Sequence, residues 1–204
     1  MLKLSIFDKL STLFNKNGFR LYIIGGTSRD LLLNEDVDDY DFVTDATPLE
    51  MREFLPDANY RFEKFGTVRL KIDSNHVDIT TLRKESSYSD ARHPSKIEFT
   101  KSIDEDYKRR DFTINAIYID ESYNVIDKCG GVDDLNKGII RFIGDPQKRI
   151  EEDPLRILRA ERFKERFNFE YAGNLGDLLR ENYHLLDKLN PEKIKEEKRK
   201  FKTK

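Results

Sequence analysis

The pattern of secondary structure changes once along the chain, and this change restricts the possible folds more than any other feature. Apolar runs of strand length alternate with helix-length segments over residues 1 to about 145, whereas residues 146–204 carry helical patterns alone. Mixed elements followed by a run of helices are typical of an α+β fold. The sequence therefore predicts an α+β domain over 1–145 and a helical domain over 146–204.

The first helix is expected near the N-terminus, where apolar residues from Leu4 to Phe14 recur at helical spacing and Gly18 is placed to end the helix. Asp8 interrupts this apolar run and no small-residue cleavage site follows, so the segment does not resemble a targeting signal. No run is long enough to span a membrane. Cys129 is the only cysteine, which excludes an internal disulfide and favours the reducing environment of the cytoplasm.

Local patterns place the remaining elements of the first domain. Strands are expected at 19–24, 39–44, 60–73 and 76–83, with a further hairpin around 120–124. Thr47 and Glu50 form a capping-box pattern at the start of a helix over 47–55. A short helix is expected over 28–34. Residues 84–96 are polar and rich in residues that break helices and strands, which predicts a mobile loop.

Two aspartates, Asp39 and Asp41, flank Tyr40 in one of these strands. Side chains at positions i and i+2 point to the same face, so the two carboxylates repel each other unless a cation lies between them. Hard carboxylate oxygens suit Mg²⁺, and Asp78 on another predicted strand is placed to add a third carboxylate. Such a cluster can hold two metal ions about 4 Å apart and promote in-line displacement at phosphorus. The alternative is a solvated, acidic strand end.

Gly25 and Gly26 lie between the first strand and the helix that follows it. Backbone N–H groups in such a turn can approach a phosphate closely, and Arg29 is placed to bind phosphate oxygens. The dinucleotide-binding pattern G-x-G-x-x-G is absent from this sequence. A tight turn held by a structural ion pair between Arg29 and Asp30 explains the same residues without a ligand.

A row of arginines marks the helix expected over Glu151–Phe167. Arg156, Arg159 and Arg162 recur every third residue and so lie close together on the helix surface. Asp153 precedes the first of them by about one turn. The formal net charge of the chain is −2, so a surface for nucleic acid must come from local clustering of this kind. A solvated basic stripe is the alternative.

Six motifs occur in an order that resembles the class II tRNA nucleotidyltransferases, the CCA-adding enzymes, and the related bacterial poly(A) polymerases. They are GGTSRDLLLNEDVDDYDFVTDATP, FGTVRL, VDITTLR, RRDFTINA, GGVDDLNKGIIRFIGDP and EDPLRILRAERF, and the resemblance covers roughly residues 10 to 170. It implies an α+β nucleotidyltransferase head of the polymerase β type, with a small mixed sheet and flanking helices, over 1–145. A helical neck over 146–204 would follow the head.

The resemblance also implies an activity and a cofactor. In this family an RNA 3′-hydroxyl attacks the α-phosphate of CTP or ATP and releases pyrophosphate, which adds C and A to the 3′ end of tRNA without a template. Asp39, Asp41 and Asp78 would be the catalytic carboxylates, and Asp39 and Asp41 would hold Mg²⁺, as two ions. The implied partners are the tRNA 3′ end, CTP and ATP, with no membrane.

Further positions match the family's nucleotide-contacting residues: Gly26, Arg29, Arg110, Asp111, Asn115, Asp153, Arg156, Arg159 and Arg162. Asp153 and Arg156 would pair with the edge of the incoming base. Arginine donates and carboxylate accepts, so the two together can address the amino group and ring nitrogen of cytosine or adenine. Uracil and guanine present a carbonyl in place of that amino group, which would leave Asp153 facing another acceptor. For Arg109, Arg110 and Asp111 the alternative is a surface ion pair.

The sequence departs from the family at some positions and in length. Ser28 and Asn34 stand where the family usually has a hydrophobic residue and a glycine. The chain ends at Lys204 without the family's helical body and tail domains, and a neck left exposed would favour a homo-oligomer. Residues 84–96 fall where CCA-adding enzymes carry a flexible segment associated with the switch to ATP. The lysine-rich tail from Pro191 is expected to be an exposed or frayed helix that either binds RNA phosphates or is solvated.

Three functions stay open on these grounds. CCA addition is favoured because VDITTLR followed by YSDARHP is closer to CCA-adding sequences. Poly(A) addition uses the same chemistry with another acceptor and another stopping rule. A catalytically impaired fragment that binds nucleotide or RNA is the third function; the three acidic positions argue against it, and the missing body argues for it.

Overall fold

The computed structural model describes residues 3–37, 39–88 and 94–201, and it describes side chains outside 86–96. Within these ranges the chain forms the α+β fold expected from its sequence. Two compact units are interleaved along the chain. The first unit comprises Met1–Glu85, Ile97–Arg110 and Asn115–Cys129, and the second comprises Ser86–Lys96, Asp111–Ile114 and Gly130–Lys204. The division into a head over 1–145 and a neck over 146–204 stays a prediction.

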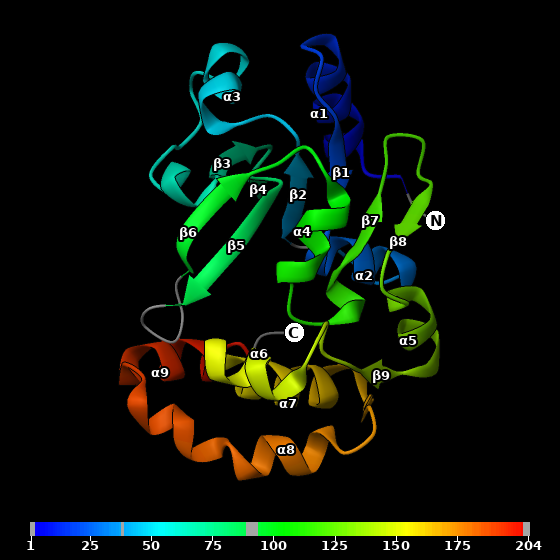
Figure 1. Ribbon diagram of the computed structural model, residues 1–204. Helices are drawn as coiled ribbons and strands as arrows, with labels where there is room; N and C mark the ends of the chain where they lie inside the picture. Colours follow the sequence, from blue (N-terminus) through cyan, green and yellow to red (C-terminus); the bar gives the residue numbers. More distant parts are fainter. Residues whose placement is uncertain (1–2, 38, 89–93, 202–204) are drawn as a thin grey trace. The chain divides into compact units, whose positions relative to one another are not determined.

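A six-stranded mixed sheet forms the centre of the first unit (Figure 1), with the strand order β3-β4-β2-β1-β7-β8. Its strands are β1 (Leu21–Ile23), β2 (Tyr40–Thr44), β3 (Thr67–Ile72), β4 (Asn75–Thr81), β7 (Ile117–Ile119) and β8 (Val125–Asp127). Strand β2 pairs in parallel with β4, and the other neighbouring strands pair antiparallel. The hairpins β3–β4 and β7–β8 confirm the two that the sequence predicts.

The helices of the first unit are α1 (Ser5–Lys16), α2 (Gly25–Leu32), α3 (Pro48–Phe54) and α4 (Ile103–Arg109), with a 3-10 helix over Glu63–Phe65. Helix α1 ends where Gly18 takes a left-handed backbone conformation with φ +82°. At α3 the Thr47 hydroxyl accepts from the Glu50 N–H, while the Glu50 carboxylate accepts from the Thr47 N–H. The predicted capping box is therefore present.

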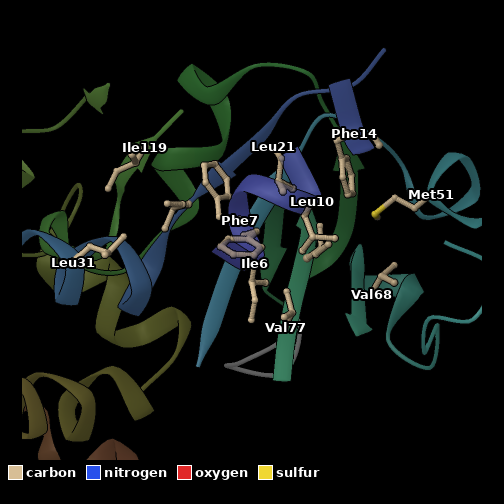
Figure 2. Close-up of a cluster of buried hydrophobic side chains, with 14 residues drawn as sticks. Ile6, Phe7, Leu10, Phe14, Leu21, Leu31, Met51, Val68, Val77 and Ile119 are labelled. Atoms are coloured by element: carbon tan, nitrogen blue, oxygen red, sulfur yellow. The ribbon is translucent and has the colours of Figure 1, made fainter. Parts of the chain in front are cut away.

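The larger core of the first unit lies between α1 and one face of the sheet. Figure 2 shows Phe7, Leu10 and Phe14 of α1 packed with strand residues that include Leu21 and Val77. Each large apolar side chain that is fully buried contributes ~1.5–3 kcal/mol. The helical spacing of these residues, which predicted an amphipathic helix, is the reason that α1 docks by one face.

A second core covers the opposite face of the same sheet. Tyr22, Val43 and Tyr118 alternate in sequence with residues of the larger core, and they pack against Ile103 and Tyr107 of α4. Helices therefore cover both faces of the sheet in the first unit. The face that α4 covers is also the face to which Asp41 belongs, because Asp41 lies two residues before Val43.

The second unit is mainly helical. Its elements are α5 (Gly131–Lys137), β9 (Ile139–Ile140), α6 (Pro146–Glu152), α7 (Leu155–Phe167), β10 (Glu170–Tyr171), α8 (Leu175–Glu181), a 3-10 helix over Tyr183–Lys188 and α9 (Pro191–Arg199). A 3-10 helix over Thr113–Asn115 belongs partly to each unit. Across the described part of the chain, no helix has the length and apolar character needed to cross a bilayer.

Aromatic side chains hold the second unit together. Phe112 stacks on Phe142 with ring centroids 4.7 Å apart, and it meets Phe163 of α7 edge-on at 5.5 Å. Strands β9 and β10 pair in parallel, so the expectation of helices alone after residue 145 is wrong. The N–H groups of Glu170 and Ala172 donate to the carbonyls of Gly138 and Ile140, which forms this short pairing.

The prediction of a loop over 84–96 is wrong for residues 84–88 and 94–96, which the structure describes as strands. Strands β5 (Arg83–Tyr88) and β6 (Pro94–Phe99) form a two-stranded sheet, while residues 89–93 lie outside the described residues. Strand pairing depends on backbone hydrogen bonds, which a polar, serine-containing segment can make as well as an apolar one.

The single helix expected over Glu151–Phe167 is two helices. Helix α6 ends at Glu152 and α7 begins at Leu155, and Asp153 between them has an extended backbone with φ −150° and ψ 94°. Pro154 explains the break, because a proline disfavours helical backbone at the residue before it. Asp153 therefore lies at a junction between helices and not on a turn of a continuous helix.

Three other elements differ from expectation. Gly25, with φ +69°, begins α2 directly, where a separate turn was expected. The strand expected over 60–73 starts only at Thr67, because Glu63–Phe65 form a 3-10 helix that ends at Gly66 in a left-handed conformation. Helix α4 was not expected, since its highly charged sequence shows no clear apolar stripe.

Candidate functional site

Charged side chains lie in register across the sheet of the first unit. Asp41 on β2 is the strand partner of Asp78 on β4, and Asp78 is the partner of Arg69 on β3. Asp39 lies two residues before Asp41, immediately outside β2. The fold therefore brings together the three carboxylates that the sequence singled out, and it adds an arginine to them.

The carboxyl group of Asp41 has a pKa raised to about 6. Burial is the largest cause, and the nearby charges of Asp78 and Asp39 raise the pKa further. The backbone of Gly26 and the charge of Arg110 act in the opposite direction. A cation beside Asp41 would relieve the repulsion among the three carboxylates, so their arrangement favours a positively charged ligand.

Arg69 binds Asp78 through two parallel hydrogen bonds. Its Nε and Nη2 atoms donate to the two carboxylate oxygens of Asp78 at 2.6 and 2.8 Å. The pairing of Arg69 with Asp78 was not expected from the sequence, because it depends on the register of the hairpin. A two-residue turn at Asp73 and Ser74, which both have positive φ, places Arg69 opposite Asp78 by symmetry about the turn.

The residues present fit a magnesium ion held by two carboxylates. Within 3–37, 39–88 and 94–201, no three His, Cys, Asp or Glu side chains converge as a metal-binding group. Mg²⁺ is usually held by one or two protein carboxylates, with waters and substrate phosphates completing its shell. A Cβ atom at Gly25 would lie 3.1 Å from Oδ2 of Asp41, so glycine keeps the space beside this oxygen open. Asp39 and Asp41 therefore suit a cation that is shared with a phosphate ligand.

Arg29 is buried in the last turn of α2. Its Nε and Nη2 atoms donate to Oδ1 of Asp30 at 2.9 and 2.7 Å, and its Nη1 atom donates to Oδ1 of Asn115 at 2.7 Å. A Cβ atom at Gly26 would lie 3.6 Å from Nη2 of Arg29 and 3.7 Å from Oδ2 of Asp41. The Arg29–Asp30 pair is thus present, and it holds the guanidinium close to Asp41 across a glycine.

Arg110 is held by an acid that was not expected from the sequence. Asp106 on α4 is fully buried and accepts from Nε of Arg110 at 3.0 Å, from the hydroxyl of Tyr118 at 2.7 Å and from Nε of Arg109 at 2.8 Å. Burial alone would raise the pKa of Asp106, but the charges of Arg110 and Arg109 hold it far below its usual range. The alternative of a solvated surface ion pair is wrong for these two arginines.

Asp111 and Arg159 lie together in the second unit. The two side chains form an ion pair, and the carbonyl of Asp111 accepts from the N–H of Ile143 at 2.9 Å. Asp111 is buried and Arg159 is half-buried. Two residues to which the resemblance assigns a nucleotide contact thus contact each other.

Arg156 is buried at the start of α7. Its Nη1 atom donates to the carbonyl of Arg149 at 2.6 Å and to Oε2 of Glu152 at 2.9 Å. The same Glu152 oxygen accepts from Nη1 of Arg149 at 2.6 Å. At the junction, Oδ1 of Asp153 accepts from the N–H of Leu155 at 3.2 Å. Arg149 and Glu152 were not expected from the sequence. The backbone carbonyl of Arg149 and the carboxylate of Glu152 fix the guanidinium of Arg156 in place.

Arg162 joins α7 to α9. Its Nε atom donates to Oε1 of Glu197 at 3.0 Å, and Glu197 is buried and also accepts from Nζ of Lys200 at 2.9 Å. The solvated stripe is therefore wrong for Arg162. Pro191–Arg199 is a helix with mostly exposed residues, which is one of the two expected states, but it is not frayed, since a buried ion pair fastens it to α7.

The amino-acid sequence matches known proteins along most of its length. Residues 21–141 match the family model described as the poly A polymerase head domain. The CCA-adding enzyme of Lactobacillus helveticus is 42% identical over 180 residues, which are 88% of this chain and 45% of that enzyme. The CCA-adding enzyme of Bacillus licheniformis is 40% identical over 178 residues, which are 87% of this chain and 45% of that enzyme.

Solved structures show the same similarity. The Bacillus stearothermophilus CCA-adding enzyme in complex with CTP has a TM-score of 0.87 and 31% identity, over 98% of this chain and 49% of that one. The Thermotoga maritima CCA-adding enzyme complexed with tRNA has a TM-score of 0.77 and 29% identity, over 98% of this chain and 47% of that one. The chain spans about half the length of the relatives it matches. Because the head-domain match covers more than half of its residues, the chain belongs to the poly(A) polymerase head-domain family, as the order of its motifs predicts.

Proposed function

We propose that this chain is a template-independent RNA nucleotidyltransferase that adds C and A from CTP and ATP to the 3′ end of tRNA. The observation that carries the proposal is the group of carboxylates around Asp41, whose pKa is raised to about 6 by burial first and then by the charges of Asp78 and Asp39. The family relationship supports the same chemistry, because relatives that share the head domain are CCA-adding enzymes.

In the proposed reaction the 3′-hydroxyl of the RNA attacks the α-phosphate of CTP or ATP, and pyrophosphate leaves. Asp39 and Asp41 would hold Mg²⁺, as two ions by resemblance, and the bound metal stabilises the charge that develops at phosphorus. The guanidinium of Arg29, held by Asp30 and Asn115, would bind phosphate oxygens near Gly26.

Arg110 would contact the ribose, and Asp106 and Tyr118 hold it in place for that role. Both carboxylate oxygens of Asp78 accept hydrogen bonds from Arg69. Asp78 would therefore contribute its negative charge beside the metal ligands and would not be a ligand itself. A cytoplasmic location and self-association stay predictions.

Base selection is proposed for Asp153 and Arg156. The arginine can donate to a ring nitrogen and the carboxylate can accept from an exocyclic amino group, which cytosine and adenine both provide. Glu152 supports the proposal because it fixes the direction of the Arg156 side chain. Arg159 and Arg162 would act as supports, through Asp111 and Glu197 respectively.

Nucleotide addition to a tRNA that ends before its CCA tests the proposal. The protein is incubated with Mg²⁺ and either CTP, ATP or both, and product lengths are read on a sequencing gel. We expect addition to stop after CCA when both nucleotides are present. Long A tails would show a poly(A) polymerase. No extension, with CTP still bound in a filter-binding assay, would show a binding fragment.

Arg156→Ala is expected to relax the choice of nucleotide. Loss of a buried hydrogen-bonding partner costs ~1–3 kcal/mol, so the preference for CTP and ATP over UTP and GTP should fall about tenfold or more. The measurement is kcat/KM for each of the four nucleotides. Arg149→Ala is the matched control, because it removes another arginine from Glu152 without a proposed base contact. Equal losses for all four nucleotides in Arg156→Ala would contradict the base-pairing role.

A further inference from the structure

One hydroxyl group connects the backbone of Asp39 to that of Asp41. Oγ1 of Thr27 donates to the carbonyl of Asp39 at 2.9 Å and accepts from the N–H of Asp41 at 2.7 Å. Thr27 is only 1% exposed, so water does not compete for these bonds. Its side chain is therefore a fixed link across the short segment that carries both acids.

The path of β1 explains why a side chain is needed at this point. Strands β1 and β2 pair antiparallel as far as Ile23 and Phe42, and the N–H of Ile24 still donates to the carbonyl of Asp41 at 3.1 Å. The chain then turns into α2 at Gly25, so β1 no longer runs beside the rest of β2. The hydroxyl of Thr27 takes the place of the next strand partner for the N–H of Asp41.

The same hydroxyl also reaches beyond the end of the strand. Asp39 precedes β2, and its carbonyl is bound by Thr27. Because one oxygen atom joins both peptide groups, it limits how far the two acidic residues can move relative to each other. Two carboxylates that share a cation need a fixed separation, and outer groups that hold metal ligands in place are known to affect affinity.

We propose that Thr27 is a positioning residue that sets the geometry of Asp39 and Asp41 for a divalent cation. This inference rests on the proposed function, since it takes the two aspartates as the metal ligands. Thr27 does not itself touch the cation or the reacting atoms. Its role is to keep the acidic segment in one backbone conformation while the carboxylates repel each other.

Thr44 provides a matched control on the same strand. Its Oγ1 donates to the carbonyl of Arg20 at 2.7 Å and accepts from the N–H of Ala46 at 3.1 Å, and the residue is fully buried. Thr27→Val and Thr44→Val therefore each remove one buried hydroxyl that donates to a backbone carbonyl and accepts from a backbone N–H. Both substitutions keep the branched shape of the side chain. Thr27→Ser keeps the hydroxyl and is the conservative variant.

Mn²⁺ is the probe, and its affinity is measured by electron paramagnetic resonance with and without CTP. We expect Thr27→Val to weaken Mn²⁺ binding by about 10- to 100-fold, as loss of an outer-shell partner does at other metal sites. Thr27→Ser should stay close to the wild-type affinity. Thr44→Val should lower the melting temperature about as much as Thr27→Val and leave Mn²⁺ affinity unchanged.

Equal Mn²⁺ affinities in Thr27→Val and Thr44→Val, with the wild type binding normally, would overturn the positioning role alone. If the wild type and Asp41→Asn bind Mn²⁺ equally well, the metal role of Asp41 in the proposed function is wrong and this inference falls with it. The two results can be told apart by Asp41→Asn. If only the positioning role is wrong, Asp41→Asn still loses Mn²⁺ binding, whereas it keeps Mn²⁺ binding if the metal role itself is wrong.

Discussion

Asp41→Asn is expected to abolish nucleotide addition and, at neutral pH, to make the protein more stable. In the proposed function Asp41 holds a metal ion that would stabilise the reacting phosphate by several kcal/mol, so the loss of Asp41 should lower kcat/KM by about 1,000-fold or more. Stability should rise because the substitution removes a half-buried charge that Asp78 and Asp39 repel. Asparagine keeps an oxygen that can accept from the backbone of Gly26. Activity and stability thus change in opposite directions.

The stability effect of Asp41→Asn has a defined pH range. The folded-state pKa of Asp41 is about 6, above its value of about 4 in an unfolded chain. The folded protein therefore binds more protons between these pH values, and wild-type stability falls as the pH rises from about 4 to about 6. Two pKa units correspond to at most about 3 kcal/mol, reduced by partial solvent screening.

Thermal melts from pH 4 to pH 8 check this expectation. The melting temperature of Asp41→Asn should exceed that of the wild type above pH 6, and the gap should close toward pH 4. Added Mg²⁺ with CTP should raise the melting temperature of the wild type and not of the variant. Asp57→Asn is the control, because Asp57 is exposed in the turn after α3 and has no role in the proposed function. Wild-type turnover in Asp41→Asn would rule out the metal role.

Asp106→Asn is expected to cause the largest loss of stability. The carboxylate of Asp106 is fully buried and compensates the charges of both Arg109 and Arg110. Removing one partner of a buried ion pair costs ~3–5 kcal/mol, because the remaining charge stays buried. For a chain of this size the melting temperature should fall by about 10 °C. The KM for nucleotide should rise as well if Arg110 contacts the ribose.

The contribution of Asp106 to stability changes with pH in the opposite direction to that of Asp41. The folded-state pKa of Asp106 lies far below its unfolded value of about 4. Its contribution to stability is therefore complete above about pH 4 and is lost as the pH falls below it. The difference in melting temperature between wild type and Asp106→Asn should accordingly shrink in acid.

Two variants separate the charge of Asp106 from its other roles. Tyr118→Phe removes one of the hydrogen bonds to the same carboxylate and keeps the charge, so it should cost only ~1 kcal/mol. Asp104→Asn makes the same substitution on the exposed side of α4, where Asp104 pairs with Lys128, and should change little. A loss in Asp106→Asn no greater than in Asp104→Asn would mean that the buried charges are not coupled.

The parts of the fold that follow from neighbouring residues were predictable. Helix α1 depends on apolar spacing, α3 on a capping box, and the alternation of Phe42 and Val43 between the two cores on the two-residue period of a strand. Each of these signals lies within a few residues, so no knowledge of the tertiary structure is needed. The break at Asp153 follows from the same kind of signal, since Pro154 comes directly after it.

The rest depends on partners far away in the sequence. Glu197 lies in a lysine-rich segment that looks solvated, and its burial follows from Arg162 on another helix. Helix α4 shows no clear apolar stripe, and Asp106 on it is buried with Tyr118 of β7. Arg69 could be paired with Asp78 only by knowing the register of the hairpin. The sequence alone therefore did not show whether such a charged residue is buried in an ion pair or exposed at the site, because its partner lies far away along the chain.

The interleaving of the two units also sets an order of events during synthesis. A chain made from its N-terminus completes the residues of the first unit at Cys129. Phe112 has been made by then, but its ring partners Phe142 and Phe163 have not. The ring of Phe112, which belongs to the second unit, therefore lacks both ring partners until α7 has been synthesised, and apolar surface left uncovered during synthesis promotes aggregation and chaperone binding.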